Sequence, residues 1–129
     1  LAWQSIETNE VGTNEFMQLS NRMGWTPMMA VNLGTGTPEE ARNWLEYTNI
    51  AEGSKWADLR REHGFEKPWD IKLWCLGNEM DGHWQIGHVP AETYAINAQQ
   101  TARMMRMCDP DIELVVCGSC AIELPTYLE

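Results

Sequence analysis

Three apolar runs of strand length divide this chain, and a stretch with helical spacing lies before or between them. The runs are residues 28–31, 71–76 and 112–117. Continuous apolar runs of this length are typical of strands that are buried on both faces of a sheet. Strands that alternate with helices form βαβ units, so the chain is predicted to have an α/β fold with a parallel sheet.

Four helices are predicted from capping signals and apolar spacing. Thr13 fits the N-cap of the first helix, and Gly24 fits its end. Thr37 fits the N-cap of the second helix, where Glu40 completes a capping box. The two remaining helices are expected at residues 54–64 and 90–109.

The number of strands does not decide between two parallel architectures. Three strands with their helices fit a flavodoxin-like open sheet. They also fit part of a (β/α)₈ barrel, which typically needs about 250 residues when complete. The barrel interpretation therefore makes this chain of 129 residues roughly half of a barrel.

The charge balance argues against two classes of partner. The chain has 9 Lys and Arg residues against 19 Asp and Glu residues, a net charge of -10. A nucleic-acid-binding protein needs a basic surface to neutralise phosphates, and anionic membranes attract basic segments. No apolar run approaches the roughly 20 residues that cross a bilayer. We therefore expect no nucleic acid partner and no membrane association, and this charge suits a neutral substrate.

The cysteine and histidine spacing does not predict a metal site. Cys117 and Cys120 have the C-x-x-C spacing, but a zinc site needs a second pair or histidines at ligand spacing. Cys75 and Cys117 lie in apolar runs, where a free cysteine packs as a small hydrophobe. We expect reduced thiols in a cytoplasmic protein with no metal and no cofactor. The opening residues, Leu1 to Gln4, do not resemble a signal peptide, and the chain is interpreted as an internal piece of a longer protein.

A polar cluster after the second apolar run contains the strongest candidate for catalysis. Asn78 and Glu79 follow this predicted strand, at the edge where barrel enzymes carry their active sites. Glycoside hydrolysis needs one carboxylic acid that protonates the leaving oxygen and a second carboxylate that faces the anomeric carbon. Glu79 suits the acid role, the Asn78 amide suits a sugar hydroxyl, and Trp84 suits an apolar sugar-binding wall. The Asn-Glu pair alone is weak evidence, because such pairs are most often solvated loop residues.

Longer motifs around this cluster resemble one enzyme family. Residues 3–10 read WQSIETNE, residues 30–36 read AVNLGTG, residues 74–82 read WCLGNEMDG and residues 84–88 read WQIGH. Together they resemble glycoside hydrolase family 51, which consists mainly of α-L-arabinofuranosidases. The resemblance covers essentially the whole chain in consistent order, so it is specific.

The resemblance implies a fold, an activity and two residue roles. The family has a (β/α)₈ barrel followed by a β-sandwich, and residues 1–129 would be a fragment of the barrel, roughly strands 3 to 5 with their helices. Its members release terminal arabinofuranose from hemicellulose-type oligosaccharides with retention, and many are hexamers, so a homo-oligomer is implied. The family motif places the general acid/base on Glu79 and a substrate contact on Asn78. The nucleophile would lie beyond Glu129.

The resemblance leaves other positions and functions open. The resemblance places Trp3 at the mouth of the loop after the second barrel strand, where it either contacts the sugar or packs. His83 occupies a position where the family usually has proline, which puts the shape of the loop in doubt. An endoglucanase or β-xylosidase would use the same chemistry. A catalytically incomplete carbohydrate-binding half-barrel is a further alternative, because the second carboxylate is missing.

Overall fold

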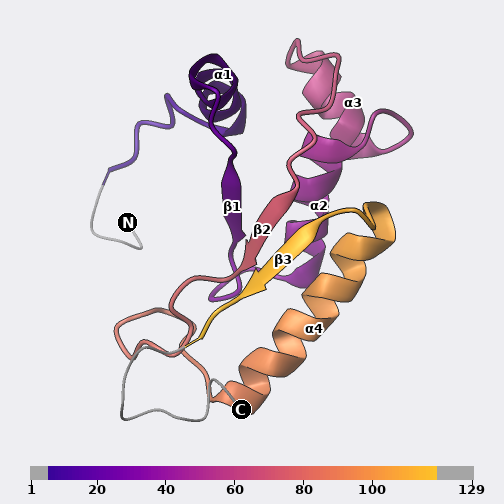
Figure 1. The fold of residues 1–129 in the computed structure, drawn as a ribbon. Helices are drawn as coiled ribbons and strands as arrows, with labels where there is room; N and C mark the ends of the chain where they lie inside the picture. Colours follow the sequence, from indigo (N-terminus) through magenta and orange to yellow (C-terminus); the bar gives the residue numbers. More distant parts are fainter. Residues whose placement is uncertain (1–5, 119–129) are drawn as a thin grey trace.

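The computed structural model describes residues 6–118, and it has the α/β fold that the apolar runs predict. Three parallel strands alternate with helices that lie on one side of the sheet (Figure 1). In chain order the elements are α1 (Thr13–Met23), β1 (Met28–Val31), α2 (Pro38–Asn49), α3 (Lys55–Glu62), β2 (Leu73–Leu76), α4 (Ala91–Cys108) and β3 (Glu113–Val116). No helix in this part of the chain is long and apolar enough to cross a membrane.

The strands pair in the order in which they occur in the sequence. β2 lies between β1 and β3, both pairings are parallel, and Ala30, Cys75 and Val115 share one row. Because the strands are parallel and in register, their carboxyl ends meet at one edge of the sheet. The loop after β1 and the longer loop after β2 both start at this edge, in the lower part of Figure 1.

The capping prediction is confirmed for α2 and wrong by one residue for α1. Glu40 N donates to the Thr37 hydroxyl at 3.1 Å, and Thr37 N donates to the Glu40 carboxylate at 2.8 Å. The N-cap of α1 is Gly12 instead of Thr13. Glu15 accepts from Gly12 N at 2.8 Å, and the Thr13 hydroxyl accepts a hydrogen bond from Trp44. A tertiary contact therefore takes the side chain that the sequence assigns to the cap.

The core lies between the sheet and the helices. Trp74 is fully buried, its indole N–H donates to Ile71 O at 2.8 Å, and its ring meets Trp44 edge-on at 5.3 Å. This arrangement suits an aromatic pair, since edge-to-face contacts are favourable and the polar indole atom has its partner. Strands and helices both contribute further buried residues to this layer: Met29 and Val31 on β1, Leu76 on β2, Leu45 on α2, and Ala98 and Met105 on α4.

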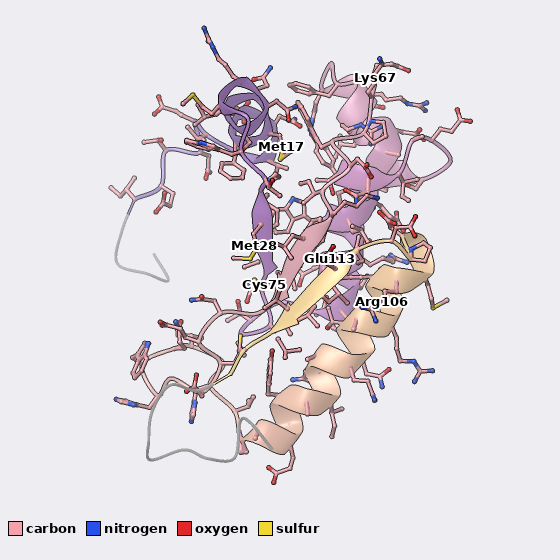
Figure 2. All side chains as sticks on the ribbon, in the orientation of Figure 1. Met17, Met28, Lys67, Cys75, Arg106 and Glu113 are labelled. Atoms are coloured by element: carbon pink, nitrogen blue, oxygen red, sulfur yellow. The ribbon has the colours of Figure 1, made fainter. Side chains whose placement is uncertain are left out.

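The opposite face of the sheet is uncovered within residues 6–118. Met28 is 55% exposed and Val115 is 41% exposed. Side chains alternate between the two faces along each strand. Met28 on β1 and Cys75 on β2, labelled in Figure 2, are on the face opposite to the buried residues Met29 and Trp74. Within residues 6–118 the strands are therefore buried on one face only, because all of the packed helices cover the same side, and burial of the other face stays a prediction for the complete protein.

One buried tyrosine joins the ends of two strands. The Tyr94 hydroxyl on α4 donates to Leu76 O at 2.8 Å and accepts from Cys117 N at 2.7 Å. Tyr94 is 5% exposed, so these hydrogen bonds are made in a desolvated environment where an unpaired polar atom is costly. The contact fixes the carboxyl ends of β2 and β3 relative to each other.

A buried arginine organises the segment between α2 and β2. The Arg60 guanidinium is fully buried, and desolvation lowers its pKa. Its fork of N–H groups donates to backbone carbonyls instead of a carboxylate, which suits a planar group with five donors. The five acceptors are the carbonyl oxygens of Tyr47, Ile50, Ala51, Phe65 and Glu66.

Two glycines bring the loops after β1 and β2 into backbone contact. Gly87 has φ 89°, which favours glycine, and a Cβ there would overlap with Gly34 Cα and O. A Cβ on Gly34 would in turn overlap with Ile86 O. We call this backbone contact between Gly34 and Gly87 the glycine seam. It holds the loop after β2 against the loop after β1.

Replacing Arg60 by Met should destabilise the complete protein strongly. The change leaves several buried carbonyl oxygens without donors, so we expect a loss of about 3 kcal/mol or more in unfolding free energy, measured by urea denaturation. Arg61→Met is the matched control, because Arg61 makes exposed ion pairs with Asp58 and Glu52 that should be worth under about 1 kcal/mol. Equal losses for the two variants would contradict the role of Arg60.

Gly87→Ala should cost more stability than Gly53→Ala. The two glycines have similar φ, 89° and 86°, but a Cβ on Gly53 meets nothing within 4 Å. Gly53→Ala should therefore lose only the left-handed backbone cost of roughly 1–2 kcal/mol. Gly87→Ala adds a steric overlap, so it should also speed proteolysis of the loop after β2. Equal unfolding free energies and equal proteolysis rates would show that the seam does not hold that loop.

Candidate active site

The candidate acid stands directly after the carboxyl end of the central strand. β2 ends at Leu76, and Asn78 and Glu79 are exposed in the loop that follows. Glu79 has φ 47°, a left-handed conformation that is uncommon for a residue with a side chain. Its carbonyl oxygen accepts from Gly82 N at 2.8 Å, which closes the turn. Such backbone conformations cluster at functional sites, which agrees with a functional role for the Glu79 turn.

Two neighbouring side chains bind the same oxygen of the Glu79 carboxylate. Trp84 Nε1 donates to Oε2 at 3.1 Å, and Gln85 Nε2 donates to Oε2 at 3.2 Å. No donor within residues 6–118 contacts Oε1. Among the described residues, the carboxylate is therefore held through Oε2 alone.

Trp84 is exposed to solvent, and its ring lies against the backbone of the loop. It is 66% exposed, and its ring meets His83 edge-on at 4.9 Å. A Cβ on Gly82 would overlap with the indole, so glycine allows the ring to lie over the turn. The indole thus has a hydrogen bond to Glu79 and a large apolar surface that remains accessible.

A small cavity beside Glu79 is lined from both loops of the glycine seam. Its volume is about 220 Å³, and its lining includes Asn32 and Thr35 after β1, and Asn78, Gln85 and Ile86 after β2. Glu79 is not among the lining residues, although its sequence neighbours Asn78 and Met80 and its hydrogen-bond partner Gln85 are. Asn78 and Gln85 thus connect the Glu79 loop to a hollow at the carboxyl ends of β1 and β2.

Asn32 holds the first of these loops in shape. Its Oδ1 accepts from Gly34 N and Thr35 N, each at 3.0 Å, and its Nδ2 donates to the Thr35 hydroxyl at 2.8 Å. Asparagine commonly stabilises turns by bonding the backbone a few residues onward. Asn32 therefore supports the cavity wall from inside its own loop.

The structure brings three of the four predicted site residues together and adds one. Asn78, Glu79 and Trp84 share one loop, whereas Trp3 lies outside the described residues. Gln85 was missed by the sequence reasoning, although a donor next to Trp84 in the WQ motif was a usable signal. Residues 6–118 contain no group of three His, Cys, Asp or Glu that could hold a metal ion. Cys120 of the C-x-x-C pair also lies outside this range.

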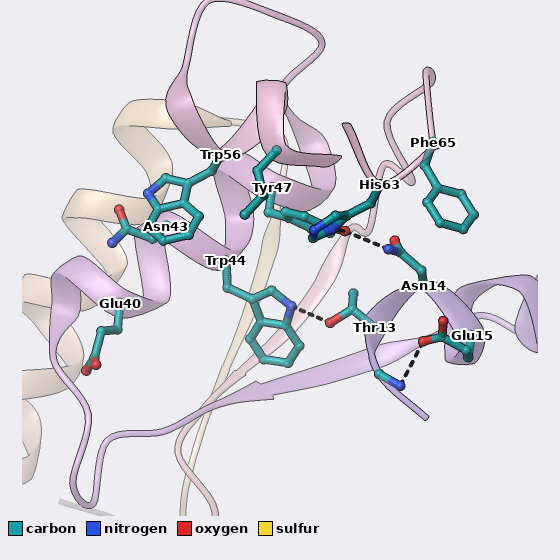
Figure 3. Close-up of a pocket in the computed structure, with 12 residues that line it drawn as sticks. Thr13, Asn14, Glu15, Glu40, Asn43, Trp44, Tyr47, Trp56, His63 and Phe65 are labelled. Atoms are coloured by element: carbon teal, nitrogen blue, oxygen red, sulfur yellow. Dashed lines mark hydrogen bonds between the residues drawn. The ribbon is translucent and has the colours of Figure 1, made fainter. Parts of the chain in front are cut away.

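A larger cavity lies elsewhere and has a structural explanation. It measures about 730 Å³ and lies between the start of α1, α2 and α3 (Figure 3). Trp44 Nε1 donates to the Thr13 hydroxyl at 3.0 Å, Asn14 Nδ2 donates to the Tyr47 hydroxyl at 2.6 Å, and this hydroxyl also meets His63 Nδ1 at 2.9 Å. These polar groups satisfy one another and tie α1 to α2 and α3. None of the lining residues comes from the Glu79 loop.

Comparison with known proteins gives a consistent result over the whole chain. The family model "Alpha-L-arabinofuranosidase 1 domain" matches residues 1–127. An intracellular exo-alpha-(1->5)-L-arabinofuranosidase 1 of Bacillus subtilis is 55% identical over 129 residues, which are all of this chain and 26% of the relative. A similarly named protein of Acetivibrio thermocellus is 53% identical over 127 residues, 98% of this chain and 25% of its own length.

A solved structure supports the same relationship. A family 51 alpha-L-arabinofuranosidase of Bifidobacterium longum superimposes with a TM-score of 0.91 at 46% identity, covering 98% of this chain and 25% of that chain. This chain therefore spans about a quarter of the length of the relatives that it matches. Because the family model and these relatives cover nearly every residue, the chain belongs to glycoside hydrolase family 51, the α-L-arabinofuranosidase family that its motifs resemble.

Proposed function

We propose that this chain is a segment of the catalytic domain of a retaining, exo-acting α-L-arabinofuranosidase, with Glu79 as its general acid/base. The observation that carries the proposal is the position of Glu79 in the loop that follows β2, with one carboxylate oxygen bound and no donor of residues 6–118 on the other. Polar residues at this edge of a parallel barrel are typical of catalysis. Family membership supplies the reaction class, and the loop supplies a carboxyl group suited to proton transfer.

The segment fits roughly strands 3 to 5 of a (β/α)₈ barrel, with residues 1–129 as part of one catalytic domain. Three consecutive parallel strands with helices on one side are what neighbouring barrel units provide. The uncovered apolar face supports this placement, since the inner face of a barrel sheet is filled by side chains from the remaining strands. Met28, Cys75 and Val115 would then face the barrel interior.

The proposed reaction needs a second carboxylate from outside this chain. Glu79 donates its proton to the glycosidic oxygen as the bond to the anomeric carbon breaks, and the bonding electron pair stays with that oxygen. The second carboxylate, about 5–5.5 Å from the first in retaining enzymes, bonds to the anomeric carbon. Glu79 then accepts a proton from water, which displaces the second carboxylate and releases the sugar with retention.

Asn78 and Trp84 are proposed to bind the sugar. Asn78 lines the cavity beside Glu79, and its exposed amide is suited to a sugar hydroxyl such as the 2-OH. The exposed ring of Trp84 offers an apolar wall beside the carboxylate. Trp3 is proposed to bind the sugar at the entrance of the same site, because it belongs to the WQSIETNE motif that resembles the family.

The proposed substrates are arabinofuranosyl oligosaccharides, and the proposed location is inside the cell. The names of the Bacillus and Acetivibrio relatives support both statements, since each describes an intracellular enzyme that removes arabinofuranose from a chain end. The net charge of -10 agrees with a neutral substrate, and we propose no nucleic acid or membrane partner. A homo-oligomer, in the form of a hexamer, is proposed for the complete protein.

Glu79→Gln in the complete protein should impair hydrolysis according to the leaving group. Arabino-oligosaccharides need a proton on the departing oxygen, so their kcat/KM should fall roughly 10²–10⁴-fold. Aryl α-L-arabinofuranosides with acidic phenols need little protonation and should lose far less. Glu62→Gln, an exposed carboxylate on α3, should leave both substrates unaffected. Equal losses on the two substrates would exclude the acid role, and turnover of cellulosic substrates in place of arabinofuranosides would exclude the proposed specificity.

A further inference from the structure

We propose that Trp84 and Gln85 are positioning residues that bind Oε2 of Glu79 and thereby leave its transferable proton on Oε1. The inference rests on the proposed acid/base function of Glu79. It assigns Gln85 a role in the reaction, and it gives Trp84 a task beyond that of a sugar-binding wall.

Both donors converge on one atom. Trp84 Nε1 lies 3.1 Å and Gln85 Nε2 lies 3.2 Å from the same oxygen, Oε2. A carboxylate oxygen has about two lone-pair sites, and an indole N–H donates without accepting. Two N–H donors therefore occupy Oε2, and a proton added there would displace one of them. The proton of the acid form consequently resides on Oε1, which no donor within residues 6–118 contacts.

This arrangement has a consequence for catalysis. An unrestrained glutamate exchanges its two oxygens by rotation about its last side-chain torsion, which is broad and roughly two-fold. The two N–H donors oppose this rotation, because turning the carboxylate would break both hydrogen bonds. One atom then gives the proton to the leaving oxygen and takes it back from water, so the orientation cost is met before the substrate binds.

The donors are held by the loop as well as by the carboxylate. Gln85 N donates to Gly82 O at 2.9 Å, and Gly82 N donates to Glu79 O at 2.8 Å, so successive turns connect the donors to the acid. The glycine seam at Gly87 anchors the end of the same loop against the loop after β1. The N–H groups are therefore placed by the backbone, which is the condition for a preorganised site.

The proposed step balances with one co-reactant from outside this chain. The O–H bond at Oε1 breaks as the proton bonds to the glycosidic oxygen, and the bond from this oxygen to the anomeric carbon breaks with its electron pair remaining on the oxygen. The nucleophilic carboxylate bonds to the anomeric carbon in the same step. Oε2 stays an acceptor of the Trp84 and Gln85 hydrogen bonds throughout.

The test compares Trp84→Phe and Gln85→Leu in the complete protein. Trp84→Phe keeps an aromatic ring and removes the N–H donor, while Gln85→Leu keeps the side-chain size and removes the amide. The measurement is kcat/KM for a series of aryl α-L-arabinofuranosides that runs from acidic to weakly acidic phenols. Each variant should lose roughly tenfold on the weakly acidic end, as expected for a hydrogen bond to a charged group, and little on the acidic end. Oligosaccharide KM should change little for Gln85→Leu.

Matched controls carry the same substitutions elsewhere. Trp25→Phe and Gln100→Leu alter exposed side chains outside the loop and should leave the whole series unchanged. Thermal unfolding of every variant shows whether it is folded, and the two single variants provide independent tests.

The pattern of kcat/KM losses across the series either supports or contradicts the positioning role of Trp84 and Gln85. A loss that grows as the phenol becomes less acidic supports positioning, whereas a uniform loss across the series, or no loss, overturns it. Glu79→Gln separates this failure from failure of the proposed function. If the loss of kcat/KM in Glu79→Gln depends on the leaving group and the losses in Trp84→Phe and Gln85→Leu do not, only the positioning role is excluded. If the loss of kcat/KM in Glu79→Gln is independent of the leaving group, the acid/base assignment of Glu79 is excluded, and the positioning role with it.

Discussion

The parallel register of β2 between its two neighbours is the constraint on which the rest of this structure depends. It brings the carboxyl ends of all three strands to one edge, so the loop that carries Glu79 starts beside the loop after β1. Tyr94 reinforces this arrangement from α4 by binding the ends of β2 and β3. Residues far apart in the sequence therefore line one hollow.

Stability and chemistry occupy different parts of the segment. The fully buried groups, Trp74 and Arg60, have their polar atoms satisfied by backbone carbonyls on the far side of the strands from the site. At the carboxyl edge, Glu79 adopts a left-handed conformation and its carboxylate is exposed. A rigid scaffold with polar residues on the loops at its edge is a common division of labour in enzymes. Here the glycine seam connects the scaffold to the Glu79 loop, because it fixes this exposed loop through contacts between backbones.

Much of the local structure was predictable. Within residues 6–118, the apolar runs predicted the three strands, and capping signals and periodicity predicted the four helices within a few residues. These features depend on neighbours in the sequence, so periodicity detects them. The cap of α1 was predicted wrongly because a distant residue competes for it: Thr13 binds Trp44 in place of capping the helix.

The sequence by itself determined the α/β class, the place of Asn78 and Glu79 at a strand end, and the family, since these depend on local pattern and on motifs that can be read in order. Only the tertiary structure decided how that carboxylate is held. The convergence of Trp84 and Gln85 on a single oxygen depends on the turn of the backbone at Glu79 and on contact between Gly34 and Gly87, 53 residues apart by their numbers. Hydrogen-bond partners and loop contacts are set by distances in space, which the order of residues along a chain does not specify.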